Sequence, residues 1–333
     1  MAVPPRRPAL MMAALAVAAA ASFLGGAARA QTVSFGVSAT RTDAASPPAP
    51  AGERFSIAVA GARVRGSRVD LSLAYDTGGG GAAQLDFGVQ ANDTFGPVGN
   101  VIGEGRVSLR TDAQAQGDLG VRGVLGPVAL GVRLSAFSAD PALFDPLAIG
   151  GDARPDFGSG GFGTSVSASG RPGRTVVLEA NPELYVVPAG VAARATARIR
   201  FLRALGNNEL SVRALGYLAP HASALDVALG VGVDVKRRGA PDLTGAVYLG
   251  WSPRGLRPGA TASFGQQLGP VTTSVALAAE PYRLDVPPYR ASVGLDFPFG
   301  PGDAHVDGAG AMGPGGLSGS LGARYSLPVT LPE

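Results

Sequence analysis

A short run of alternating arginines is the part of the sequence best suited to hold or filter a charged solute. Arg194, Arg198 and Arg200 stand in "ARATARIRF", with small or apolar residues between them. Residues two apart share one face of an extended chain, so the three guanidinium groups point the same way. We expect Arg213 of the next run, "ELSVRALGYL", to stand nearby. Such a basic stripe could select solutes in a pore, as rings of charged residues do in channels.

The same arginines could instead only neutralise acidic neighbours. The acidic residues that we weigh as their partners are Glu209, Asp226 and Asp234. Paired in this way, the stripe would be part of a polar wall with little free charge. The sequence leaves both interpretations open.

A second group of charged residues lies in one long irregular stretch from Ser138 to Gly163. It contains Asp140, Asp145, Asp152 and Asp156, which suggest calcium by type but lack the spacing of a calcium-binding loop. The segment is too long for a plain hairpin, so we expect a loop with a function or a solvated insertion.

The sequence contains little that would support catalysis or cofactor binding. His221 lies in a turn and His305 near the C-terminus, and spacing identifies no catalytic partner for either, so we predict no enzyme. "GAGAMG", from Gly308 to Gly313, matches a dinucleotide fingerprint, but prolines and glycines follow it where a helix should begin, so we read it as turn glycines. We expect no metal and no cofactor.

Composition points to an exported protein. Residues 1–30 combine Arg6 and Arg7, an apolar run and the small-x-small site Ala28-Arg29-Ala30, which predicts a cleaved signal peptide; the alternative is an uncleaved anchor. There is no cysteine, so no disulfide or thiolate site is available. Once the three signal arginines are removed, the basic residues fall from 28 to 25 and equal the acidic ones, which argues against a nucleic-acid binder.

The rest of the chain alternates apolar and small or polar residues with a period of two, so residues 31–333 are predicted to form a single all-β domain. "ALDVALGVGVDV", for example, places valines and leucines on one side and Asp, Ala and Gly on the other. Counting such runs gives about 16 strands, within a range of 14 to 18, because "GTSVSASG" and "DAHVDGAGAMG" are weak. Leu-Gly-Pro-Val or Phe-Gly-Pro-Val recurs three times and predicts short turns at one rim.

The apolar stripes could face lipid or a second sheet. A soluble sandwich gives the same alternation, but its polar face usually carries many charges, whereas only 16% of this chain is charged and 50 residues are glycine. A long meander also needs closure to remove its edge strands. Turning the three arginines of "ARATARIRF" toward lipid would cost about 2–4 kcal/mol each at the bilayer midplane, so they are predicted to face a lumen.

These patterns resemble bacterial outer-membrane β-barrel proteins of the porin-like class, over Gln31 to about Leu327. The last strand, "SLGARYSL", also looks like a barrel-assembly signal, although the chain continues to Glu333. The resemblance implies a closed antiparallel up-and-down transmembrane barrel in the outer membrane of a Gram-negative-type bacterium. Membrane lipid, the barrel-assembly machinery and further copies of the chain are its implied partners.

Within that resemblance, the expected function is a passive channel for small hydrophilic solutes, with residues 138–163 as the constriction loop. The alternative is a non-conducting structural or adhesive barrel whose lumen the same loop fills. Aromatic belts at the membrane edges would rest on Trp251, Tyr282 and Tyr289, the last two from twin "PYR" motifs.

Overall fold

The computed structural model of the chain describes residues 32–42, 52–64, 67–77, 81–95, 99–138, 160–205, 208–219, 227–237, 241–284, 286–313 and 316–328. The predicted signal peptide lies outside these ranges, and so do His221, Asp226, most of the long loop and its four aspartates.

Eighteen strands account for nearly all of the described chain. They are β1 (Thr32–Thr42), β2 (Gly52–Val64), β3 (Ser67–Asp76), β4 (Ala82–Phe95), β5 (Gly99–Arg110), β6 (Ala115–Leu125), β7 (Val128–Phe137), β8 (Gly161–Gly170), β9 (Val176–Val187), β10 (Gly190–Leu205), β11 (Asn208–Leu218), β12 (Val227–Arg237), β13 (Asp242–Ser252), β14 (Gly255–Leu268), β15 (Val271–Ala279), β16 (Tyr289–Phe299), β17 (Gly302–Gly313) and β18 (Gly316–Pro328).

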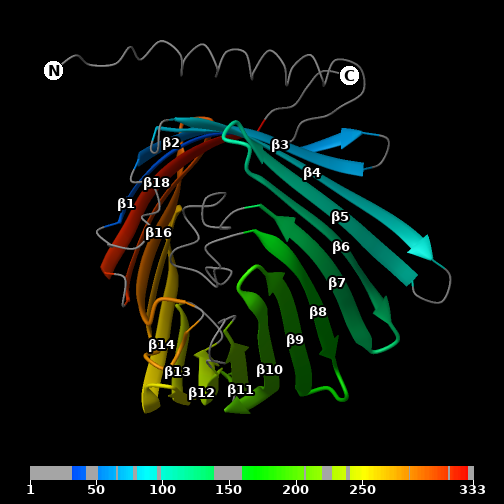
Figure 1. Cartoon of the computed structure of the whole chain (residues 1–333), viewed down its shortest axis with the longest axis vertical. Coiled ribbons are helices and arrows are strands. Elements are labelled where there is room, and N and C mark those ends of the chain that lie inside the picture. The colour runs from blue at the N-terminus through cyan, green and yellow to red at the C-terminus, as the bar shows by residue number, and fades with distance from the viewer. Residues whose placement is uncertain are drawn as a thin grey trace.

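The strands form one closed ring. Each strand pairs antiparallel with its neighbours in sequence, and β1 pairs with β18 as well as with β2. Figure 1 shows this closure where the blue first strand lies beside the red last one. The predicted closed up-and-down barrel is therefore confirmed. The strand number is at the upper end of the predicted range because both weak segments form strands, β8 and β17.

The outer wall of the barrel is apolar. On β12, Leu229, Val231 and Val233 are exposed, and Val231 leaves 58% of its surface uncovered. Asp234 on the opposite side of the same strand is only 1% exposed. This alternation repeats around the ring, so the large exposed side chains form the lipid-compatible surface of a transmembrane barrel.

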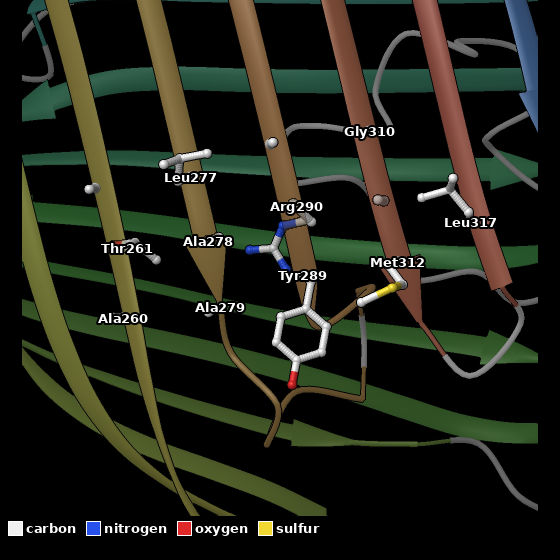
Figure 2. Close-up of a pocket in the computed structure, with 13 residues that line it drawn as sticks. Ala260, Thr261, Leu277, Ala278, Ala279, Tyr289, Arg290, Gly310, Met312 and Leu317 are labelled. Carbon is white, nitrogen blue, oxygen red and sulfur yellow. The ribbon is translucent and has the colours of Figure 1, made fainter.

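One part of the outer wall is hollowed across β14 to β18 (Figure 2). The depression has a volume of about 500 Å³. Its small lining residues include Ala260, Ala262 and Ala291, and Leu277 and Leu317 are among the larger ones. The small side chains create the hollow without interrupting the apolar surface.

The two rims differ in their connections. Glycine–proline turns join β6 to β7 and β14 to β15, with positive φ angles of 58° at Gly126 and 62° at Gly269 that glycine adopts without strain. In an up-and-down barrel both turns lie at the same rim, as predicted. The opposite rim carries the long connection between β7 and β8 and the nine residues between β15 and β16.

The predicted aromatic belt is only partly correct. Trp251 and Tyr289 are exposed on the outer wall, whereas Tyr282 is 1% exposed and packs inside the barrel. The prediction for Tyr282 is wrong because its segment turns inward instead of lying along the membrane edge.

No described residues form a helix that is long and apolar enough to cross a membrane.

Candidate functional site in the lumen

Arg194 is held by the strand next to it. In the antiparallel register of β9 and β10 its direct partner is Glu183. Its Nε and Nη2 donate to the two carboxylate oxygens of Glu183 over 3.1 and 2.9 Å. This two-pronged arrangement matches the planar guanidinium to the carboxylate and neutralises both charges within the wall.

Arg198 and Arg200 belong to one network with three acidic side chains. Arg200 donates to Glu209 over 2.6 Å from Nε and to Glu179 over 2.7 Å from Nη1. Arg198 forms an ion pair with Asp234 and donates from Nε to Ser211 over 2.9 Å. Glu209 and Asp234 are almost completely buried, and the network replaces part of the hydration that they lose, although Oδ1 of Asp234 has no hydrogen-bond partner among the described residues.

Arg213 is the member of the group that stands apart. It lies opposite Arg198 in the register of β10 and β11, and opposite Gly232 in that of β11 and β12. No side-chain hydrogen bond or ion pair joins it to any residue in the described part of the chain. The structure thus brings all four predicted arginines together on the lumen wall and pairs three of them.

The connection from β15 to β16 folds into the lumen, and we call its described residues, 280–284 and 286–288, the strap. Its anchor is Tyr282, whose ring lies against three inward-facing glycines on adjacent strands. A Cβ atom added at Gly250, Gly230 or Gly259 would come within 1.9, 2.6 or 2.9 Å of that ring. The three positions therefore form a notch that only glycine leaves open, and we call it the glycine notch.

Glu280 holds the strap together. Its carboxylate accepts a hydrogen bond from the Tyr282 hydroxyl over 3.1 Å, and forms ion pairs with Arg283 at 3.5 Å and Arg290 at 2.5 Å. The Glu280 amide donates to the Pro288 carbonyl over 2.7 Å, which closes the base of the strap. Burial, and then the charge of Glu280, raise the pKa of the Tyr282 phenol, so it stays protonated and remains a donor.

Apolar packing fixes the strap to the wall beneath it. Tyr282 clusters with Leu215, Ala246 and Tyr248 of β11 and β13. Leu284 packs against a second cluster that includes Tyr217 and Ala228. The strap thus covers the inner faces of β11 to β14.

A cavity of about 350 Å³ opens between the strap and the wall of β8 to β13. Charged, hydroxyl and amide side chains make up most of its lining: Ser165, Ser167, Glu179, Asn181, Glu183, Arg194, Thr196, Arg198, Arg213, Tyr248, Glu280, Tyr282 and Arg283. The paired arginines and Arg213 therefore face a confined space with a largely polar lining.

Strands β16 and β17 carry a smaller polar group. The Nδ1 atom of His305 lies 2.5 Å from Asp296 and its Nε2 atom 3.5 Å from Asp307. Among the described residues no cluster of three or more histidine or acidic side chains is arranged to hold a metal ion.

Sequence reasoning missed the strap and the glycine notch. The two "PYR" motifs predict tyrosines at the membrane edge, which fails for Tyr282, and the pattern does not reveal that Arg283 and Arg290 converge on Glu280. The sequence does contain a sign of the notch. Gly230 and Gly250 occupy inward positions of two neighbouring strands, which leaves space for an aromatic side chain between them. The predicted constriction loop, residues 138–163, lies mostly outside the described residues and stays a prediction.

Comparisons with known proteins find similarity only among solved structures. No family model matches the chain, and no curated protein matches it. A mutant of the Rh. blastica porin is 12% identical with a TM-score of 0.45, over 90% of this chain and 99% of that one. A bacterial polysaccharide outer-membrane secretin is 9% identical with a TM-score of 0.49, over 89% of this chain and 98% of that one.

Proposed function

We propose that the protein is a porin-like passive channel for small hydrophilic solutes in the outer membrane of a Gram-negative-type bacterium. The observation that carries the proposal is a closed ring of 18 strands with an apolar outer wall and a charged inner one. Barrels of 16–18 strands are wide enough to enclose an aqueous channel. The chain would reach this membrane through its signal peptide and the barrel-assembly machinery.

The strap supports a sieving role. It occupies lumen space next to the arginine network and is held by a buried aromatic anchor and a buried ion-pair cluster. A constriction made by a fixed segment limits solute size without a moving part. Charged groups on both sides of the cavity favour hydrophilic over apolar solutes.

Conductance in planar lipid bilayers tests the proposal. Protein shown to be folded by its heat-modifiable migration in gels should produce stable current steps in potassium chloride. Folded protein that inserts without conducting overturns the channel proposal.

If the wild type does not conduct, a variant lacking residues 139–159 tests whether the long loop blocks the lumen. Conductance that appears only in this variant identifies a barrel filled by its own long loop. Absence of conductance in both proteins rejects the structural or adhesive barrel filled by this loop, as well as the open channel.

A further inference from the structure

We propose that the cavity under the strap binds the carboxylate of a small hydroxylated organic anion, with the Arg213 guanidinium as its charged contact. The inference rests on the proposed function and names the class of solute that the lumen retains during passage. The proposed site consists of Arg213 and the residues around it; the arginines that already have acidic partners are not proposed as ligand contacts.

Among the described residues, the charges of the cavity leave one positive charge without a counter-charge. Each acidic residue of the lining is paired: Glu183 with Arg194, Glu179 with Arg200, and Glu280 with Arg283 and Arg290. Of the four arginines in the lining, Arg194, Arg198 and Arg283 have acidic partners. Arg213 has no such partner among the described residues and provides the excess charge.

The strand register makes this excess charge costly in an empty cavity. Arg198 and Arg213 are direct cross-strand partners, and like charges in that position destabilise a sheet. Arg198 is compensated by Asp234 and Ser211, whereas Arg213 faces the repulsion alone among the described residues. An anion bound at Arg213 removes that repulsion and gains a charge-assisted hydrogen bond.

Neutral polar groups of the same cavity define the rest of the ligand. Ser165, Ser167, Asn181 and Thr196 line it, and none of their side chains hydrogen-bonds to a described residue. Hydroxyl and amide groups both donate and accept, so they suit a ligand with several hydroxyl groups. A volume of about 350 Å³ is near the lower end of ligand pockets, about 300–1,000 Å³, and fits a small solute.

A second arginine offers a matched control. Arg324 lies on the inward face of β18, across the register from His305, and also lacks a side-chain partner among the described residues. It does not line the cavity. Arg324→Gln therefore removes the same charge from the lumen wall without touching the proposed site.

Calorimetric titration of the folded, detergent-solubilised full chain with gluconate tests the site, with glucose as the neutral probe of similar shape. The wild type should bind gluconate at least about tenfold more tightly than glucose, because only gluconate carries a carboxylate. Arg213→Gln should weaken gluconate binding at least about tenfold, Arg213→Lys should restore part of it, and Arg324→Gln should leave it unchanged. Equal gluconate binding by the wild type and Arg213→Gln, or equal losses in the two Gln variants, would overturn the proposal.

Titration needs no ion flow, so the two proposals fail in different ways. A silent bilayer together with Arg213-dependent gluconate binding rejects the channel and supports the site. A conducting channel whose chloride current gluconate blocks equally in the wild type and in Arg213→Gln rejects the site and supports the channel.

Discussion

The inner wall beneath the strap and the inner wall of β16 to β18 follow the same alternating pattern, but their inward side chains meet different surroundings. Under the strap, Leu215 is 9% exposed and Tyr248 is 8% exposed. On β16 and β17, the side chains of Asp296 and His305 are 57% and 36% exposed. A period of two decides which residues face the lumen, but a connection folded back into the barrel decides which of them remain in water.

The contrast also explains where large residues and glycines occur on the inner wall. Beneath the strap, Tyr248 and Leu215 help to bury Tyr282, while Gly230 and Gly250 make room for its ring. The strap packs on β16 and β17 near its own base, through Arg290 and through Pro288 beside Gly313, whereas the wall around His305 presents hydrophilic groups such as Asp307. The wall beneath the strap is therefore built like a protein core and the wall around His305 like a channel surface.

Removing Tyr282, the anchor of the strap, should have the largest effect on stability. It should also expose the wall beneath the strap to water, as the wall around His305 is exposed. Tyr282→Ala is expected to destabilise the packed strap by about 3–5 kcal/mol, because a buried aromatic side chain is lost. Trypsin should then cut after Arg283 in the folded barrel, and the channel conductance should rise. Tyr282→Phe keeps the ring in the glycine notch and should resist trypsin as the wild type does. Resistance in Tyr282→Ala would show that the strap does not depend on this contact.

The strands of both wall regions are assigned an outward face in lipid. A charge placed on that face tests the assignment. Val231→Arg should lower the free energy of unfolding in lipid vesicles by about 2–4 kcal/mol, the cost of an arginine near the bilayer midplane. Ser274→Arg, on the inward and exposed face of β15, should change it little. Urea titration measures both variants. Equal effects would contradict the assignment of the two faces.

Filling the glycine notch is the next smaller change. Gly250→Val places side-chain atoms where the Tyr282 ring lies, and overpacking of this kind costs about 1–3 kcal/mol. Gly245→Val on the same strand is the control, because nothing lies within 4 Å of an added Cβ there. Trypsin sensitivity after Arg283 should increase only in the first variant; matching digestion patterns would count against the notch.

The smallest expected effect is at a rim turn away from the strap. Hydrogen bonds from Arg110 hold the pKa of Asp112, in the turn between β5 and β6, below its ordinary value. A lowered pKa in the folded state adds stability above the ordinary carboxyl pKa of about 3.9 and loses it as the pH falls below that value. Because the Asp112 side chain is 42% exposed, solvent screening limits the gain to under about 1 kcal/mol.

Unfolding of the wild type and of Asp112→Asn at pH 7 and pH 3 measures this contribution. The variant should be less stable than the wild type at pH 7, and the difference should shrink at pH 3. A difference that does not change with pH would rule out ionisation of Asp112 as its cause.

Much of the barrel could be predicted from sequence, whereas the candidate site could be predicted only in part. Alternation identified the strands and placed Arg194, Arg198 and Arg200 on one face, because a strand repeats every two residues whatever surrounds it. The partners of these arginines depended on register. Glu209 and Asp234 were expected as partners, but Glu179 and Glu183 of β9 became partners only when the antiparallel pairing of β9 with β10 set them beside the arginines.

The sequence by itself determined an all-β chain, an apolar face on its strands, tight glycine–proline turns at one rim and a cluster of arginines directed away from lipid. These properties depend on local geometry and on the cost of placing charge in hydrocarbon. Tertiary structure alone decided that the strap turns inward, that Tyr282 occupies a notch shared by three strands, and that Arg213 is left without a partner in the described chain. Those outcomes depend on contacts between residues far apart in sequence, which the closed ring brings within a few ångströms of one another.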